Sequence, residues 1–112
     1  MSRLSARLWE ERMGMLPVYE IDLEHGWVKA SSPEGPLLRK WEKGRVMLGS
    51  GLRDKKGREI YEGDFVERKG KRWKVLRKKG CFLARRKGRS LPLYEMKPKK
   101  CLVKGHRFQK SE

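Results

Sequence analysis

The clearest periodic signal in the chain is an alternation of apolar and polar positions in its second half. In the segment RWKVLRK at 72–78, Trp73 and Val75 share one side while Lys74 and Lys78 share the other. A period of two residues is typical of a strand that is buried on one face only. Similar short segments, bounded by glycine-containing turns, are DFVERK at 64–69, CFLARR at 81–86, LPLYEM at 91–96 and CLVKGHRF at 101–108.

Short strands at regular spacing predict one small β unit over residues 64–112. A meander of this length suits a small SH3-like β-barrel, which is the fold we expect for this part of the chain. An OB-like barrel and a plain curled sheet are the alternatives.

The first half of the chain shows weaker β-type patterns. Strands are expected from VYEIDL within residues 14–23, from GWVKAS at 26–31 and from RVMLGS at 45–50. The proline- and glycine-containing SSPEGP predicts a loop, and LLRKWEKG after it is either one helical turn or more loop, so we place a loop at 31–44. Residues 1–50 are thus a β-rich segment, and the expected class is mainly β, with α+β as the alternative.

The segment from Ser2 to Met13 fits two structures. Intrinsic propensity favours a helix, and Leu4, Leu8 and Arg12 share a helical face. Alternation of Leu4, Ala6 and Leu8 fits a strand equally well. The residues alone leave helix or strand open at 3–13.

Charge is distributed very unevenly along the chain. Residues 1–66 hold 12 Lys and Arg against 11 Asp and Glu, a net charge of +1. Residues 67–112 hold 18 against 3, a net charge of +15. So dense a cationic half repels itself in the folded state, which favours a polyanionic partner such as nucleic acid over a merely solvated face.

The cysteines and the apolar runs bear on location. Cys81 and Cys101 are far apart and form no CxxC, so two free thiols in a cytoplasmic protein are expected, with a single disulfide as the alternative. No apolar run is long enough to cross a membrane, and the N-terminal MSRLSARLWEERMG lacks the apolar core of a secretory signal. We expect no membrane association.

The segment GLRDKKGREIYEGDFV at 51–66 gathers four carboxylates between glycines, which raises the question of a catalytic or metal-binding cluster. An EF-hand loop beginning at Asp54 would place Lys56 and Arg58 at ligand positions, so that motif is excluded. The interleaved cations give each carboxylate an opposite charge in solvent, whereas catalytic acids need surroundings that shift their pKa. No catalytic residue is assigned here.

Turn chemistry explains the same segment better. Asp54 followed by Gly57 suits a type I turn whose glycine is left-handed, with the Asp side chain accepting backbone N–H groups. A similar turn is expected at Gly63. We interpret 51–66 as a structural connector between 1–50 and the barrel, all within one compact unit. Its structural residues are Gly51, Leu52, Asp54, Gly57, Ile60, Tyr61, Gly63 and Asp64.

This connector resembles the signature of the YopX family of small phage and prophage proteins, approximately T-G-L-K-D-K-N-G-K-E-I-Y-E-G-D-I-V. The direct matches are Gly51, Leu52, Asp54, Lys55, Gly57, Glu59, Ile60, Tyr61, Glu62, Gly63, Asp64 and Val66. ARLWEERMGML is similar to the family's opening FRAWDKETKKML, and CLVKGHRF resembles VIGNIYEN, with His106 in place of the usual Asn.

The resemblance implies a mainly β protein with a C-terminal SH3-like part, a phage or prophage origin and a life in the host cytoplasm. It also implies a strand and turn near the N-terminus, which overrules helix propensity there. It implies no reaction, so no catalytic residue is carried over.

The basic half contains the candidate binding residues, which we call the sheet cations. They are expected to merge into one surface patch, where phosphate neutralisation gives affinity without sequence specificity. Trp73, Phe82 and Tyr94 lie among them in sequence, either as base-stacking side chains or, as we favour for Trp73 and Phe82, as core. The sheet cations are Lys69, Lys71, Arg72, Lys74, Arg77, Lys78, Lys79, Arg85, Arg86, Lys87 and Arg89.

No other motif suggests a site. His25 and His106 do not pair with the cysteines at metal-ligand spacing, and the glycines form neither GxGxxG nor a P-loop, so no metal or cofactor is expected. We therefore predict a non-catalytic protein whose partner is nucleic acid, DNA or RNA, or a nucleoprotein complex. The alternative is an adaptor or host-takeover factor that binds an acidic surface of a host protein.

Overall fold

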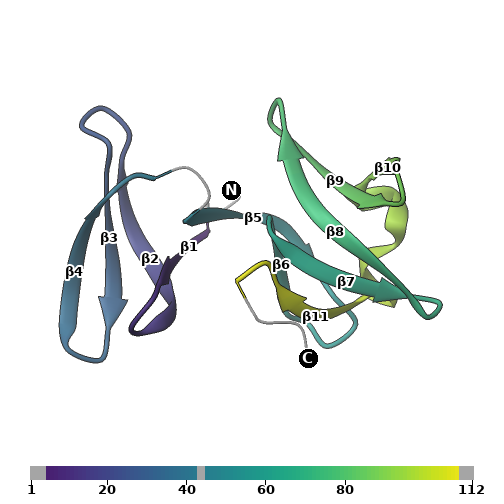
Figure 1. The fold of residues 1–112 in the computed structure, drawn as a ribbon, viewed down its shortest axis with the longest axis horizontal. Helices are drawn as coiled ribbons and strands as arrows, with labels where there is room; N and C mark the ends of the chain where they lie inside the picture. The colour runs from purple at the N-terminus through teal and green to yellow at the C-terminus, as the bar shows by residue number, and fades with distance from the viewer. Residues whose placement is uncertain (1–4, 43–44, 109–112) are drawn as a thin grey trace. The chain divides into compact units, whose positions relative to one another are not determined.

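The structure is a computed structural model that describes residues 5–42 and 45–108 (Figure 1). It is built almost entirely from antiparallel strands, which confirms the mainly β class. The chain divides into two compact units, one ending at Leu48 and one beginning at Gly49, whereas the sequence predicted one. Strand β5, Val46–Arg53, spans the division: its first residues pair with the first unit and its last with the second.

The first unit is an antiparallel sheet in which the first four strands form a meander, and the following strand returns to pair with the first one. Ala6, Leu8, Leu16, Val28 and Ala30 alternate with half-buried or exposed residues and form its core. One side of the meander is therefore apolar, as a half-buried sheet requires. Its strands are β1 (Ala6–Glu10), β2 (Gly14–Asp22), β3 (Trp27–Ser32) and β4 (Gly35–Lys40), followed by the start of β5.

Two ambiguities in the first half are resolved. Residues Ala6–Glu10 are a strand, as the family resemblance implied and helix propensity did not. The prediction of a loop over 31–44 was wrong for Gly35–Lys40, which form β4. Pro33 and Glu34 make a tight turn, and Pro36 falls at the sheet edge where its missing N–H removes no ladder bond.

The second unit contains a five-stranded antiparallel sheet in the order β10-β9-β8-β7-β11 (Figure 1). Its buried core includes Ile60, Val66, Val75, Ala84 and Leu93. The side of the sheet that carries Val66, Val75 and Ala84 is the core-facing side, and the other is the outer side. The strands are β6 (Glu59–Tyr61), β7 (Asp64–Arg68), β8 (Lys71–Lys78), β9 (Cys81–Arg86), β10 (Arg89–Pro92) and β11 (Leu102–His106).

The predicted strand at 91–96 is corrected by the structure. The chain leaves β10 at Pro92 and forms a 3₁₀ turn, η1, over Leu93–Met96, followed by η2 over Pro98–Lys100. Pro92 cannot continue a ladder as a donor, and a 3₁₀ turn places residues three apart on one side. Leu93 and Met96 are both buried as a result.

The sheet of the second unit is open rather than a closed barrel. Within the described residues, β10 pairs only with β9 and β11 only with β7, so the two edges do not join. Closure of the expected small SH3-like barrel is therefore not seen, and the SH3-like assignment stays a prediction. The 3₁₀ turn η1 contributes Leu93 and Met96 to the core.

The aromatic and sulfur side chains of the second unit have distinct environments. Trp73 and Phe82 pack against the core, as we favoured, whereas Tyr94 is 69% exposed. Both cysteines are free thiols, Cys81 exposed and Cys101 buried. Burial raises the pKa of the Cys101 thiol, which makes it a packing residue at neutral pH. Within the described residues, no helix is long and apolar enough to span a membrane.

Candidate nucleic-acid interface

Asp54 is the centre of the connector and is structural. Its Oδ1 accepts the backbone N–H groups of Lys56 at 3.0 Å and Arg58 at 2.9 Å, which closes the turn. Its Oδ2 accepts the backbone N–H of Val103 at 3.0 Å and the Arg58 guanidinium at 3.2 Å. The carboxylate thus ties the turn to β11, far away in sequence.

The surroundings of Asp54 set its charge. Burial opposes ionisation, but the N–H groups of Val103, Arg58 and Lys56 and the charge of Arg58 outweigh it. The pKa of Asp54 is therefore held below its ordinary value. An acid with a lowered pKa and every oxygen lone pair engaged is suited to holding a fold together, not to giving up a proton.

Asp64 and Gly63 perform a second structural task. Asp64 is buried and its Oδ2 accepts the N–H of Tyr61 at 2.9 Å. Gly63, at φ +87°, donates its N–H to the Val75 carbonyl at 2.8 Å. The turn interpretation of the connector agrees with this geometry. The expectation that all its carboxylates lie in solvent was wrong for Asp54 and Asp64, because backbone N–H groups replace water around them.

The three hairpin turns of the cationic sheet share an unusual composition. Each is a two-residue loop of Lys then Gly, with both residues at positive φ: 53° and 74° for Lys69 and Gly70, 50° and 79° for Lys79 and Gly80. Lys87 and Gly88 repeat the pattern. Type I′ turns require this backbone and favour Asn or Asp at the first position, since a lysine there is strained. The lysines are not explained by turn geometry.

The strand register places like charges directly across from one another. Arg68 is the cross-strand partner of Lys71, Lys74 of Arg85, and Arg86 of Arg89. Like charges at such positions destabilise a sheet. These pairs cost stability in the isolated protein, and an anion between them would relieve the cost.

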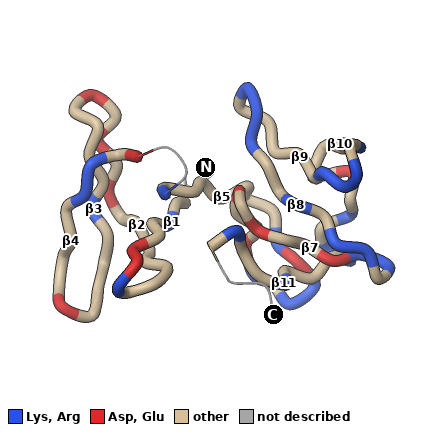
Figure 2. Tube along the Cα trace, viewed as in Figure 1, with Lys and Arg blue, Asp and Glu red and all other residues tan. Residues whose placement is uncertain are grey.

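The sheet cations have no carboxylate partners among the described residues. The ion pairs of the second unit involve Arg58 and Asp54, not the sheet cations. Positive charge follows the turns and strands β8 to β10 (Figure 2), whereas β7 carries Asp64 and Glu67 as well as Arg68. Some side chains are nevertheless held in place: the Arg72 guanidinium lies 5.5 Å from the Phe65 ring centroid, and Arg85 Nε donates to Ser90 Oγ at 3.1 Å.

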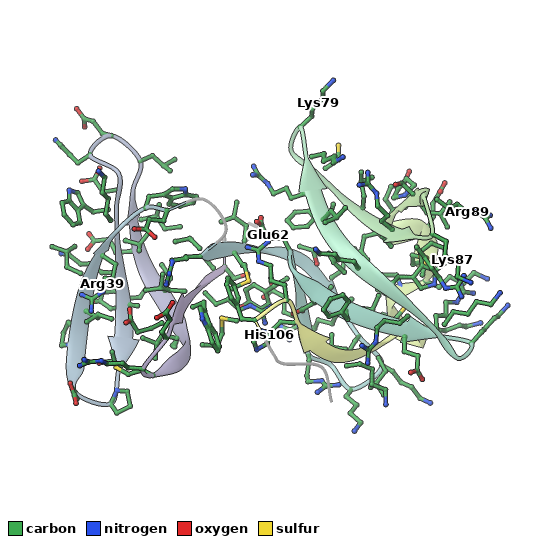
Figure 3. All side chains as sticks on the ribbon, viewed as in Figure 1. Arg39, Glu62, Lys79, Lys87, Arg89 and His106 are labelled. Atoms are coloured by element: carbon green, nitrogen blue, oxygen red, sulfur yellow. The ribbon has the colours of Figure 1, made fainter. Side chains whose placement is uncertain are left out.

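The expected single patch is instead divided between two sides and two ends of the sheet. By strand alternation, Arg72, Lys74, Lys78 and Arg85 belong to the outer side, and Lys71, Arg77, Arg86 and Arg89 to the core-facing side. Lys79 lies at the opposite end of the β8–β9 hairpin from Lys87 and Arg89 (Figure 3). Because β8 is eight residues long, the cations at its two ends lie too far apart to form one patch.

A hollow of about 320 Å³ lies at the end of the sheet that carries the Lys69 and Lys87 turns. One of its residues, Arg68, was not among the predicted sheet cations, although the alternation that defined the strand places it on the core-facing side with Val66. Arg68 Nε is buried with no hydrogen-bond partner in the described structure. The hollow is lined by Arg68, Lys69, Lys71, Trp73, Arg89, Leu91 and Met96.

Metal ligands do not gather anywhere in the described part of the chain. Its His, Cys, Asp and Glu side chains form no group of three that could hold an ion. The Asp22 carboxylate instead accepts the His25 backbone N–H at 3.0 Å and contacts His25 Nδ1 at 2.9 Å on the surface of the first unit.

Comparison with known proteins matches nearly the whole chain, residues 12–110, to a family described as YopX protein. The chain belongs to the YopX family. The match includes the connector around Asp54 and all three cationic hairpin turns, so the resemblance carried by residues 51–66 is confirmed. No curated protein matches this YopX-family chain.

Proposed function

We propose that this YopX-family protein is a non-catalytic binding protein whose C-terminal sheet contacts nucleic acid mainly through phosphates. The single observation that carries the proposal is the pairing of like charges across β7 to β10. Like-charge pairs weaken the free protein, and they are retained where a ligand supplies negative charge. A phosphate backbone supplies negative charge at regular intervals.

Three features of the sheet support phosphate contact over base-specific reading. The sheet cations are exposed at turns and along strands, apart from the half-buried Arg85 and Arg86, and can reach a backbone of either strand type. Guanidinium groups of Arg72, Arg85 and Arg89 suit phosphate oxygens, which they bind in a fork. No helix of the described chain is available to enter a major groove, since its only helical segments are the short turns η1 and η2. Affinity is therefore expected to depend little on sequence.

The decisive experiment is fluorescence anisotropy of labelled single- and double-stranded DNA and RNA against the purified protein, over a salt series. We expect binding at low salt and a logarithmic salt slope of roughly −4 to −8, because each neutralised phosphate contributes about −0.9. The slope counts the phosphates that the cations contact.

Absence of binding to every oligonucleotide at low salt would overturn the proposal. The sheet cations would then be assigned to an acidic surface on a host protein, the alternative function. Salt-sensitive retention of one lysate protein, insensitive to nuclease and lost when the sheet cations are reversed, would identify that partner.

A further inference from the structure

We infer that the hollow at the turn end of the C-terminal sheet is a nucleotide pocket that holds one phosphate and the flat ring of its base. This inference rests on the proposed function and specifies where a single strand is gripped. The cations of the hollow come from three places in the chain: Arg68 from β7, Lys69 and Lys71 from the first hairpin, and Arg89 from β10.

The charge of the hollow has no internal counterpart. Arg68 and Lys71 are direct cross-strand partners of the same sign. None of the four cations has a carboxylate partner among the described residues, and the buried Arg68 Nε–H has no acceptor. A buried donor without an acceptor is costly, and a phosphate oxygen is an acceptor of the right charge.

The rest of the lining is apolar and includes one aromatic ring. Trp73 packs against the core by one part of its surface and is half-buried, which leaves part of the indole facing the hollow. Leu91 is likewise half-buried, and Met96 is buried beneath. A nucleobase has a polar edge and an apolar face, and such a face stacks on tryptophan.

The volume agrees with one nucleotide rather than a longer segment. About 320 Å³ lies at the small end of the range for ligand pockets. A base paired within a duplex keeps both faces stacked on its neighbours and cannot enter. The pocket therefore requires a base free of a duplex, at a strand end or in a single strand.

Tryptophan fluorescence gives a direct test, because Trp73 is the only tryptophan after residue 41. A ten-nucleotide oligothymidylate is titrated into the full-length protein, alongside a ten-base-pair duplex. We expect the oligothymidylate to quench emission and to bind more tightly than the duplex. In Trp73→Leu the quench disappears and single-strand affinity falls about tenfold, while duplex affinity is unchanged.

Two charge variants make the assignment specific. Arg68→Gln, inside the hollow, is expected to weaken oligothymidylate binding several-fold more than duplex binding. Lys74→Gln, on the outer side of the same sheet, removes the same charge and should weaken both equally. Arg68→Gln also remains informative if Trp73→Leu fails to fold.

A titration with thymidine 5′-monophosphate shows whether the pocket takes free nucleotides or only strands. Quenching by thymidine 5′-monophosphate assigns the pocket to free nucleotides as well as strands, and quenching by the oligothymidylate alone assigns it to strands. Unchanged quenching in Trp73→Leu, or equal losses for single strand and duplex in Arg68→Gln, would overturn the pocket while leaving the proposed function intact. No binding of either oligonucleotide would overturn both.

Discussion

Both units of this YopX-family protein contain short antiparallel meanders, but they differ in how charged side chains are arranged across neighbouring strands. In the first unit Glu20 lies across from Lys29 and their side chains form a 2.9 Å ion pair. In the second unit three cross-strand pairs hold cations on both strands, as at Lys74 and Arg85, although Glu67 lies across from Arg72. The first sheet contains ion pairs across its strands, whereas the second contains like-charge pairs, which under our proposal are neutralised by a partner.

The turns repeat this difference. Positive-φ residues in the described first unit are all glycines, including Gly14, Gly26 and Gly35, which adopt that backbone without strain. In the second unit the hairpin turns put lysines at positive φ. Stability alone explains the turn residues of the first unit, whereas the second unit has strained lysines at turn positions that a ligand can reach. This is the pattern expected where function competes with folding.

The largest expected effect comes from reversing charge in the second unit only. Lys78, Lys79, Arg85 and Arg86 are changed together to Glu, and binding of oligonucleotides should fall at least 100-fold at low salt, because repulsion replaces several phosphate contacts. Anisotropy measures the loss, and circular dichroism checks that the strands remain.

A charge-matched comparison uses exposed cations in each unit. Lys79→Glu with Lys87→Glu should weaken binding strongly, while Arg12→Glu with Lys40→Glu in the first unit should change it little. Both double variants alter net charge equally. Equal losses would show that overall charge, not the sheet of the second unit, attracts the nucleic acid.

The second effect concerns the two aspartates with lowered pKa values. Asp54→Asn should destabilise the protein by about 2–3 kcal/mol, because buried N–H donors and Arg58 lose a charged acceptor. Asp22→Asn, at an exposed position in the first unit, should leave the unfolding midpoint unchanged. Urea unfolding of both variants provides the comparison, and equal midpoints for the two would contradict the role of Asp54.

The pH dependence of this effect has a definite sign. The N–H groups around Asp54 hold its folded pKa below the unfolded value of about 3.9. Its contribution is therefore complete above that pH and is lost as pH falls through the folded pKa. The stability gap between wild type and Asp54→Asn should narrow below about pH 4; a gap that stays constant would mean that ionisation is not involved.

A smaller effect tests the backbone of the connector. Gly57 has φ +80° and open space where a Cβ would lie, so only strain is introduced by substitution. Gly57→Val should cost roughly 1–2 kcal/mol, and Gly57→Asn clearly less, since Asn tolerates the left-handed region. Thermal unfolding distinguishes them. Similar costs for Val and Asn would point to a cause other than φ.

The smallest effect sharpens the comparison between the turns. Changing Lys69, Lys79 and Lys87 to Asn should stabilise the protein by roughly 1 kcal/mol in total, because Asn suits a type I′ turn. The same variant should lower the magnitude of the salt slope by about 2–3, since three cations are gone. A variant that gains stability and keeps its full slope would show that the turn lysines do not contact phosphate.

The amino-acid sequence by itself determined the mainly β class, the family and the structural role of residues 51–66. These follow from residues that lie close together in the sequence. The alternation of apolar and polar residues in 72–78 fits a strand with one buried face, and the spacing of Asp54 and Gly57 fits one type of turn. The uneven charge also indicated the second half as the candidate interface, which stays a prediction. Aromatic burial of Trp73 and Phe82 was predictable because large rings in alternating strands face the core.

Tertiary structure decided what depends on pairing between distant segments. Gly35–Lys40 is a strand because it pairs with the free edge of β3, although its own proline and glycine favour a loop. Leu93–Met96 leaves the sheet because Leu93 and Met96 complete a core assembled from other strands. The bond from Val103 to Asp54 spans 49 residues.

The candidate site shows the same division most clearly. Sequence supplies the cations, but register decides which of them oppose one another, and a shift of one residue would move every one of them to the other side. Arg68 lines a hollow with Arg89 only because the fold brings the end of β7 and the starts of β8 and β10 together beside η1. Charge is a property of the chain, whereas the convergence of charges is a property of the fold.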